Sequence, residues 1–331
     1  MRIGLIGLGP TGAYHLERIS LRDDLLLVTA CDSCADTIHA HPLFRELASS
    51  PTDVLARTDV DYVLVAAPQK MRCDLVLRAL EAGKNVAVDG PPCLDSGEAR
   101  SLLAASRRTG RTVCVLPTRR DGFDFRAARH MVQSGRLGRI EAARILTWAK
   151  AVPLNSSELA GDEESPSTVS GEGAFTFFAY QYVDQMLQLV GRPAKTVFAR
   201  ISPLPESDST AAAFFMAIAF RDGGDGLIDV NLHSGAALQT GWTLAGATGA
   251  YCQQRIHVIE PSGEVCDVPL GPSDIPQADL YSKLFEPARS ETDRLRSIEE
   301  AATVMEILDA ARESSGTGQV VEIRVESEQD T

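Results

Sequence analysis

The amino-acid sequence predicts an α/β protein in two parts. A doubly wound parallel sheet comes first, followed by an α+β domain with an open, mainly antiparallel sheet. The first part is predicted because strand-like and helix-like segments alternate from Met1 to about Leu116, with a glycine-rich turn after the first strand. The second is predicted because short apolar strands with turn residues between them dominate the rest of the chain. We place the domains at residues 1–118 and 119–331.

The opening stretch carries the most specific pattern. An apolar strand over residues 2–6 runs directly into Gly7–Gly12, which reads G-x-G-x-x-G. A helical stretch (13–21) and a second apolar strand (25–30) follow, and Asp32 stands twenty positions after the last glycine. Strand, glycine turn, helix, strand and acid in this order indicate a Rossmann dinucleotide-binding unit.

Each glycine of this turn, the helix N-terminus and Asp32 have separate physical roles. The first glycine permits the tight turn, the second lets the backbone approach a pyrophosphate, and the third lets helix and strand pack closely. The helix N-terminus offers N–H groups and a positive dipole end to the phosphates. A carboxylate at Asp32 can accept both adenine-ribose hydroxyls and would repel a 2′-phosphate, so we expect NAD rather than NADP. The expected cofactor contacts here are Gly7, Leu8, Gly9, Pro10, Thr11, Gly12 and Asp32.

Length and charge exclude several other classes of protein. A chain of 331 residues exceeds one ordinary core and suits two domains. Its formal charge of −13 argues against nucleic acid or an anionic membrane as a partner. No apolar run approaches the roughly 20 residues that span a bilayer, and no signal-like segment precedes the first strand, so we expect a cytoplasmic protein.

Cysteine usage predicts neither disulfides nor a metal site. The seven cysteines are scattered, as expected in a reducing compartment. Cys31 and Cys34 form a C-x-x-C with His39 and His41 nearby, but no second pair follows at a finger-like spacing, and the thioredoxin context is missing. We therefore expect no bound metal.

The remaining elements follow from periodicity and turn residues. In the first part we expect strands at 61–67, 85–89 and 112–116, and helices at 71–82 and 99–109. In the second we expect helices at 123–134, 174–190 and 297–314, and strands at 140–149, 196–201, 211–220, 227–232, 242–247, 251–260, 265–268 and 319–325.

Six segments in order resemble one known family. They are Gly7–His15 (its G-x-G-x-x-G-x-x-H), Ala67–Lys84 (T-P-x-x-x-H…A-L-x-A-G-K), Asp89–Pro91 (E-K-P), Gly135–Ile140 (G-x-I/L-G-x-I), Gly171–Asp184 (its catalytic helix) and Leu244–Gly249 (I-x-G-x-x-G). The chain thus resembles the glucose–fructose oxidoreductase / inositol dehydrogenase / MocA (Gfo/Idh/MocA) family over nearly its whole length.

The resemblance implies an NAD(P)-dependent oxidoreductase acting on a small, sugar-like substrate. It adds Ala67, Pro68 and Asp89 to the expected cofactor contacts, and it implies a cis peptide bond between Gly90 and Pro91. It also implies a homo-dimer or homo-tetramer, assembled through the sheet of the second domain.

The catalytic residues of the family are missing here. Its lysine position is Gly90, its aspartate position is Phe177, its helix histidine is Gln181, and the histidine of T-P-x-x-x-H is Arg72. Glycine and phenylalanine cannot exchange a proton, and glutamine does not titrate. Loss of such general acid–base help commonly costs about 10²–10⁴ in rate.

Three residues are candidates to replace the missing groups. Phe177, Gln181 and Asp184 share one helix face, with Tyr180 beside it. Tyr180 could donate a proton or pack in the core. Gln181 could hydrogen-bond a substrate oxygen, and Arg72 could hold a carboxylate or phosphate, or be an exposed arginine without a ligand.

Three further residues lie on the predicted second-domain sheet, whose family counterpart faces the substrate: Trp148, Lys150 and His233. Each could equally be structural. The sequence therefore favours an NAD-dependent oxidoreductase with an atypical site. The alternatives are a catalytically inactive NAD(H)-binding regulatory protein, or a non-redox enzyme that uses bound NAD in a closed cycle.

Overall fold

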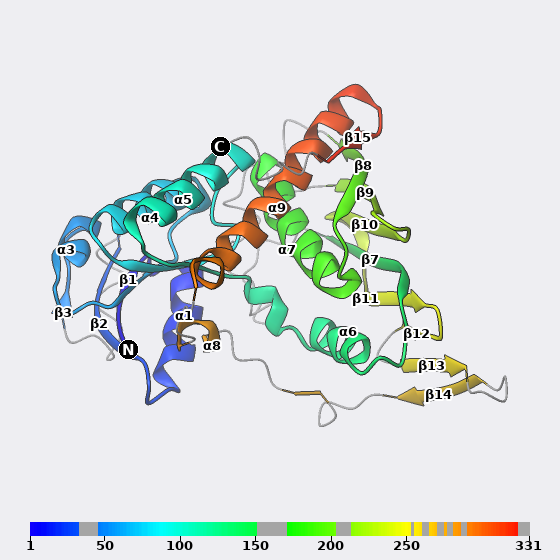
Figure 1. Cartoon of the computed structure of the whole chain (residues 1–331), viewed down its shortest axis with the longest axis horizontal. Helices are drawn as coiled ribbons and strands as arrows, with labels where there is room; N and C mark the ends of the chain where they lie inside the picture. Colours follow the sequence, from blue (N-terminus) through cyan, green and yellow to red (C-terminus); the bar gives the residue numbers. More distant parts are fainter. Residues whose placement is uncertain are drawn as a thin grey trace. The chain divides into compact units, whose positions relative to one another are not determined.

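The computed structural model describes residues 1–32, 46–150, 171–202, 213–252, 255–259, 265–269, 275–276, 281–285 and 290–323. These fall into two compact units (Figure 1). The first holds the described residues of 1–117 and 281–302, and the remaining described residues form the second.

The first unit is built on a six-stranded sheet with the order β3-β2-β1-β4-β5-β6, in which all pairs are parallel. The strands are β1 (Arg2–Ile6), β2 (Leu26–Cys31), β3 (Glu46–Leu47), β4 (Tyr62–Val65), β5 (Asn85–Asp89) and β6 (Val113–Leu116). The helices are α1 (Pro10–Ser20), α3 (Pro51–Ala56), α4 (Gln69–Glu81), α5 (Ser96–Thr109), α8 (Ser282–Phe285) and the first part of α9 (Glu291–Thr317).

The strand order reverses direction between β1 and β4. Because parallel crossovers are right-handed, α1 lies on one face of the sheet, and α4 and α5 lie on the other (Figure 1). Both faces are therefore covered, and the inner strands read as continuous apolar runs: all of β6, for example, is buried. This is the doubly wound arrangement predicted from the sequence, with its switch point between β1 and β4.

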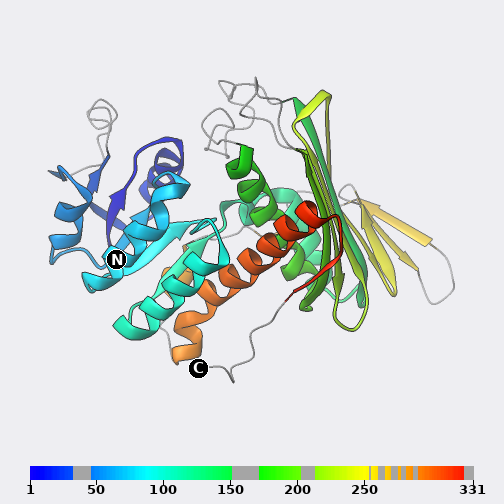
Figure 2. The ribbon, with the colours of Figure 1, turned by 90° about the horizontal axis from the view of Figure 1, so that it is seen from above.

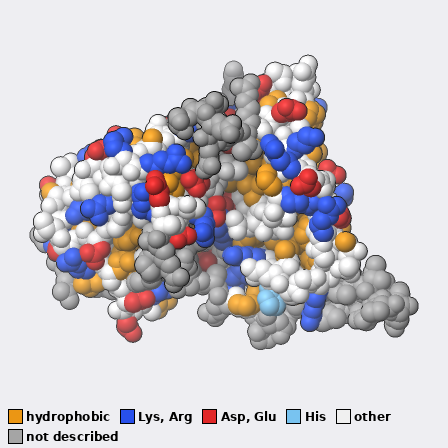
Figure 3. Space-filling view, in the orientation of Figure 1, with side chains coloured by type: hydrophobic (Ala, Val, Ile, Leu, Met, Phe, Trp, Pro, Cys, Tyr) orange, Lys and Arg blue, Asp and Glu red, His pale blue; other side chains and the backbone are white. Residues whose placement is uncertain are grey.

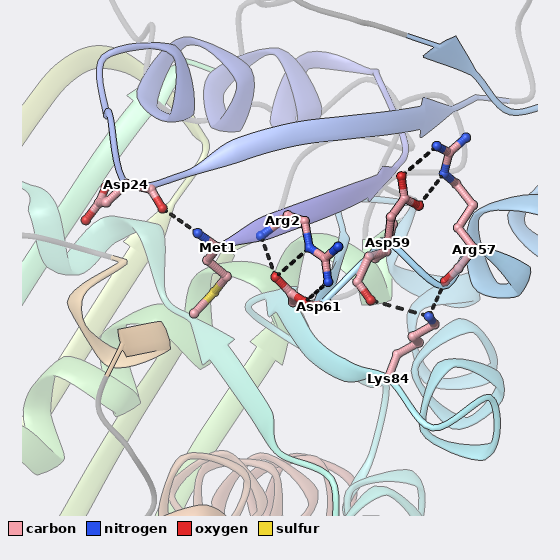
Figure 4. Close-up of polar contacts among 8 residues, drawn as sticks. Met1, Arg2, Asp24, Arg57, Asp59, Asp61 and Lys84 are labelled. Atoms are coloured by element: carbon pink, nitrogen blue, oxygen red, sulfur yellow. Dashed lines mark hydrogen bonds and ion pairs between the residues drawn. The ribbon is translucent and has the colours of Figure 1, made fainter.

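Polar contacts fix the amino-terminal edge of this sheet (Figure 4). The N-terminal amine donates to the carbonyl of Asp24 at 2.7 Å, and Arg2 pairs with Asp61 through Nη2 and Oδ1 at 2.7 Å. Lys84 donates from Nζ to two backbone carbonyls, those of Arg57 and Val60. The glycine-rich turn lies at the opposite edge, at the carboxyl ends of the strands.

The surface of the first unit carries exposed ion pairs between its helices, among them Arg108 with Glu81 and Arg107 with Glu299. Figure 3 shows basic and acidic side chains intermixed on the visible face of this unit. Neither sign forms a continuous patch among the described side chains of that face.

The second unit contains a nine-stranded sheet with the order β14-β13-β12-β11-β7-β10-β9-β8-β15. Its strands are β7 (Ile140–Lys150), β8 (Ala194–Ser202), β9 (Ala213–Phe220), β10 (Asp225–Asn231), β11 (His233–Gly246), β12 (Gly249–Cys252), β13 (Arg255–Ile259), β14 (Val265–Pro269) and β15 (Val321–Glu322). The pair β7–β10 is parallel and the others are antiparallel.

The helical elements of this unit are the 3₁₀ turn η1 (Thr118–Asp121), α6 (Phe123–Gln133), α7 (Gly171–Val190) and the second half of α9 (Glu291–Thr317). Figure 2 shows the sheet nearly edge-on, with α7 and this half of α9 on the same side. Along β9 the burial alternates, so that Phe214, Met216, Ile218 and Phe220 point into the core.

One aspartate ties α6 to the sheet. Oδ2 of Asp124 accepts the backbone N–H of Trp242 at 2.8 Å, and Oδ1 lies 3.5 Å from the hydroxyl of Tyr251. A Cβ at Gly241 would lie 2.0 Å from this carboxylate, so the close approach requires glycine there. Burial raises the pKa of Asp124, while the hydrogen bonds from Trp242 and Tyr251 oppose that rise.

The predicted fold class is confirmed: a Rossmann-type parallel sheet is followed by a mixed, mostly antiparallel one. One strand assignment is wrong. We expected a single strand over 251–260, but Cys252 pairs with Arg255 and the chain reverses between them, so β12 and β13 form a hairpin. Among the described residues, no helix is both long and apolar enough to cross a membrane.

Candidate functional site

The glycine-rich turn joins the end of β1 to α1 and has the geometry that its sequence predicts. Gly7 has φ +99°, a conformation that side chains rarely adopt, and its N–H donates to the carbonyl of Cys31 at 2.9 Å. A Cβ there would lie 2.5 Å from the carbonyl oxygen of Ala66. The turn is therefore pressed between β2 and the end of β4.

The other two glycines of the motif differ in what surrounds them. A Cβ at Gly12 would lie 2.2 Å from the carbonyl oxygen of Gly7, so that position closes the turn on itself. A Cβ at Gly9 would meet no heavy atom within 4 Å among the described residues. Gly9 is also the N-cap of α1, without a side chain to occupy the helix terminus. The backbone at Gly9 is therefore open to an incoming phosphate.

Asp32 lies directly after β2 and reaches back to the turn. Its Oδ2 accepts the backbone N–H of Leu8 at 2.5 Å. The side chain of Leu8 is itself buried, whereas Asp32 is only partly so. The expected ribose-binding carboxylate is thus held against the turn that would hold the pyrophosphate.

Pro10 and Thr11 form the first turn of α1. Pro10 has no N–H, a loss that costs nothing at the first helical position. Thr11 is buried. No acidic side chain stands in this first turn, so the positive end of the helix dipole is not neutralised from within the helix.

Ala67, Pro68 and Asp89 follow at the ends of β4 and β5. Pro68 is the N-cap of α4, and Ala67 and Asp89 are buried. The expected cis peptide bond between Gly90 and Pro91 is confirmed. These residues lie on the β4 side of the switch point, where the second half of a dinucleotide is expected.

Arg72 is fully buried beneath this edge. Its Nε donates to the carbonyl of Ala67 at 2.8 Å, and Nη1 donates to the carbonyl of Pro91 at 3.0 Å. Its Nη2 lies 3.1 Å from Oδ2 of Asp89. These contacts hold the ends of β4 and β5 together, and the expected grip of Arg72 on a ligand stays a prediction.

Two residues of the same region were not predicted as site residues. His15, the last residue of the motif, is fully buried, and its Nδ1 lies 2.7 Å from the hydroxyl of Tyr281. Its Nε2 faces Oδ1 of Asp89 at 3.9 Å. The spacing of His15 from the glycines is a sequence signal, whereas nothing in the sequence links Tyr281 to the turn.

In the second unit, α7 carries the remaining candidates. Phe177, Tyr180, Gln181 and Asp184 are all buried. Asp184 accepts a hydrogen bond from Nε of Arg120 at 2.7 Å. The carboxylate on this face is thus already engaged by an arginine of η1.

A second arginine of η1 lies next to Phe177, which the resemblance puts at the family's aspartate position. The guanidinium of Arg119 lies over three aromatic rings, with centroid distances of 5.8 Å to Phe177, 5.0 Å to Phe178 and 5.8 Å to Tyr182. A positive charge therefore lies next to the ring of Phe177. The only sequence signal for it is the pair of arginines that follows Pro117.

The second-domain sheet holds one more candidate that can be described. Nε1 of Trp148 donates to Oδ1 of Asp229 at 3.2 Å, a contact between neighbouring strands. Lys150 and His233 pair through their backbones, and their side chains lie outside the described residues.

Two of the cysteines that the structure describes have a raised thiol pKa. Burial raises the pKa of Cys31 to about 12, with a further contribution from Asp32, and burial raises the pKa of Cys73 to about 12. Cys34, His39 and His41 lie outside the described residues. Within the part of the chain that is described, no three His, Cys, Asp or Glu side chains gather as metal ligands.

Comparison with known families identifies both parts of the chain. Residues 1–116 match a family model described as "Oxidoreductase family, NAD-binding Rossmann fold". Residues 125–252 match the "GFO/IDH/MocA C-terminal domain".

Individual proteins agree with this match. The chain is 25% identical over 237 residues to myo-inositol 2-dehydrogenase of Thermotoga maritima, covering 69% of this chain and 68% of that protein. It is 30% identical over 144 residues to D-glucoside 3-dehydrogenase of Escherichia coli, covering 42% of this chain and 41% of that protein. The structure of the WlbA dehydrogenase from Bordetella pertussis, in complex with NADH and UDP-GlcNAcA, has the same fold: TM-score 0.76, 20% identity, and coverage of 98% of this chain and 99% of that one.

Proposed function

The chain belongs to the Gfo/Idh/MocA oxidoreductase family with its NAD-binding Rossmann domain, and on that premise we propose that it is an NAD-dependent oxidoreductase with an atypical active site. Its substrate is a small, sugar-like molecule. Hydride transfer takes place without the Lys-Asp-His set that the family motifs lead one to expect.

The observation that carries the proposal is the geometry of the glycine-rich turn. Gly12 is locked against Gly7, whereas the space at Gly9 is open and the start of α1 has no side-chain cap. This combination fits a pyrophosphate, whose oxygens would accept the free N–H groups at the helix start. Asp32, held by Leu8, would accept the ribose hydroxyls.

Bound NAD(H) supplies or accepts the hydride. The chain's own residues bind and orient it: Gly7–Gly12 and Asp32 take the adenine half, and Ala67, Pro68 and Asp89 take the other half at the ends of β4 and β5. The same carboxylate of Asp32 would repel a 2′-phosphate, so the proposal includes preference for NAD(H) over NADP(H).

On the substrate side, α7 offers binding groups rather than a strong acid or base. Gln181 would hydrogen-bond a substrate oxygen, and Tyr180 would donate the proton. Arg72, in the first unit, would have to exchange its contacts with Pro91 and Asp89 to hold an anionic group. Arg119 places a positive charge beside Phe177. A substrate with an electron-poor C=N or C=C, or one that carries its own proton, would need no Lys-Asp-His set.

A second candidate function rests on the same departures. With Gly90, Phe177 and Gln181 in the catalytic positions, the protein could bind NAD(H) without turnover and act as a regulator. A third, non-redox use of NAD would show itself as tightly held, non-exchanging cofactor. Turnover assays on the purified protein separate these candidates.

The proposal extends to domains, assembly and location. Residues 1–118 form the cofactor domain, which residues 281–302 join in the first compact unit. The rest of residues 119–331 form the domain that binds substrate and assembles homo-dimers or homo-tetramers in the cytoplasm. The face of the sheet away from α7 supports this, because Phe198, Phe215, Leu227 and Trp148 are only partly buried there. Light scattering of the purified protein would decide the assembly.

The primary experiment is a titration with NADH and NADPH, followed by nicotinamide fluorescence. Micromolar NADH binding with much weaker NADPH binding is the expected result. Carbonyl, imine and enone compounds would then be screened for oxidation of bound NADH. If neither nucleotide binds, and none is carried through purification, the oxidoreductase proposal is wrong.

A further inference from the structure

Four buried polar side chains meet under the carboxyl-terminal edge of the first sheet. Asp89 ends β5. His15 approaches it from α1 on one face of the sheet, and Arg72 approaches from α4 on the other. Tyr281 completes the group beside His15 at 2.7 Å. All four are at most 3% exposed, in a region where polar groups need partners.

One contact in this group, between His15 and Asp89, is not a direct hydrogen bond. Nε2 of His15 and Oδ1 of Asp89 are 3.9 Å apart, too far for a direct hydrogen bond, which needs about 2.7–3.2 Å. Neither atom has a hydrogen-bond partner within the described part of the chain. The other ring nitrogen of His15 and the other oxygen of Asp89 are both engaged, by Tyr281 and Arg72.

The separation fits one particular occupant. A water molecule about 2.8 Å from each atom would make an angle near 90° between them, within the range that hydrogen-bonded water tolerates. Buried waters typically connect groups that otherwise lack partners. With water in place, Tyr281, His15, Asp89 and Arg72 form one continuous hydrogen-bonded chain.

The position of this hydrogen-bonded network indicates its function. In the proposed function, Asp32 holds the adenine half at the end of β2, and the start of α1 holds the pyrophosphate. The nicotinamide half must then lie across the switch point, over the ends of β4 and β5. Asp89, Gly90 and Pro91 form that end of β5. Arg72 holds them from one face only, through the carbonyl of Pro91 and the carboxylate of Asp89.

We propose that a single water molecule binds between Nε2 of His15 and Oδ1 of Asp89, and that His15 acts through it as a positioning residue for the nicotinamide half of the cofactor. His15 holds the Asp89–Pro91 turn from the α1 side, opposite Arg72. The water site stands by itself, whereas the positioning role rests on the proposed NAD(H) binding.

A crystal structure of the full chain tests the water site. Electron density for one water within about 3.2 Å of both atoms is expected. Direct contact of His15 with Asp89, or a 3.9 Å separation without density between, would overturn it. In Asp89→Glu the longer side chain reaches roughly 1.5 Å farther, so it should contact His15 directly and displace the water.

Ligand binding tests the positioning role. His15→Asn keeps an amide near Nδ1 for Tyr281 and removes the nitrogen that faces Asp89. We expect its NADH affinity to fall by about tenfold, while the affinity for ADP-ribose, which lacks nicotinamide, changes by less than about twofold. Equal loss for both ligands would indicate a merely structural role and overturn the proposal, as would no loss at all.

Two further variants complete the experiment. His15→Gln retains an amide near Nε2 and should recover most of the NADH affinity, whereas His130→Asn, on α6 of the second unit, should leave both affinities unchanged. If the wild-type protein bound neither NADH nor ADP-ribose, the proposed function and the positioning role would both be wrong. The crystal structure would still decide the water site.

Discussion

Oδ2 of Asp32 and the backbone nitrogen of Leu8 are joined by a hydrogen bond of 2.5 Å. The bond connects the residue after β2 to the turn after β1, so the two elements expected to bind the adenine half of the cofactor are fixed to one another. A charged acceptor makes such a bond stronger than a neutral one. The carboxylate is therefore both a structural partner of the turn and the group expected to select NAD(H).

Asp32→Ser should shift the cofactor preference. Without the carboxylate, the ribose hydroxyls lose their acceptor and a 2′-phosphate is no longer repelled. We expect NADH affinity to fall by about tenfold and NADPH affinity to rise, so that the two dissociation constants approach each other. Fluorescence titration with both nucleotides measures this. Asp23→Ser, in the loop before β2, is the control, and an unchanged preference in Asp32→Ser would contradict the assignment.

Alanine at Gly9 and at Gly12 should have opposite consequences for binding and folding. A Cβ at Gly9 meets nothing within 4 Å in the described structure, and its φ of −59° suits alanine. Gly9→Ala should therefore leave the melting temperature unchanged, but lower NADH affinity by at least about tenfold, because the methyl group occupies the path of the pyrophosphate.

Gly12→Ala should instead damage the fold. Its Cβ would lie 2.2 Å from the carbonyl oxygen of Gly7, and backbone on both sides has to move. We expect a loss of about 1–3 kcal/mol in the free energy of unfolding, measured by urea denaturation. A destabilised Gly9→Ala with normal NADH binding would show that this turn does not hold the phosphates.

The glycine-rich turn shows what can be predicted from the sequence alone. The turn was predictable because each glycine has a local steric reason that spacing reveals. Helix α3 was missed, although Ser50 as N-cap and Pro51 at the first position are recognisable start signals. The hairpin between β12 and β13 was missed because Cys252 to Arg255 contains no glycine, proline, asparagine or aspartate.

The polar clusters were less accessible to sequence reasoning. Tyr281 reaches His15 across 266 positions of the chain, and no periodicity encodes such a contact. The alternative that Arg72 is an exposed arginine is wrong: its side chain is fully buried, and the sequence does not reveal this burial. Arg119 was passed over for the same reason: only the fold places it over the ring of Phe177.

The buried pair Arg120–Asp184 should matter far more for stability than the exposed pair Arg2–Asp61. The side chains are 12% and 4% exposed in the first pair, against 47% and 41% in the second. Arg120→Met leaves a buried carboxylate without its cation and should cost about 3–5 kcal/mol. Arg2→Met, the matched exposed change, should cost less than about 1 kcal/mol. Equal losses in urea denaturation would contradict this assignment.

The pKa of Asp124 predicts how stability depends on pH. Burial raises this pKa above the ordinary value of 3.8. Asp124 therefore stays protonated to a higher pH in the folded protein than in the unfolded chain. The unfolding free energy of the wild type should therefore fall, relative to that of Asp124→Asn, as pH rises from about 3.8 through the raised pKa. Urea denaturation across this range measures the difference between the two proteins.

Asp61→Asn provides a control of opposite sign. The hydrogen bond from Arg2 lowers the pKa of Asp61, so its contribution to stability is present above the ordinary value of 3.8 and disappears as pH falls through the lowered pKa. The wild type should thus lose stability relative to Asp61→Asn on acidification, and relative to Asp124→Asn as pH rises. If both differences had the same sign, the buried environment of the carboxylate between α6 and β11 could not be the cause.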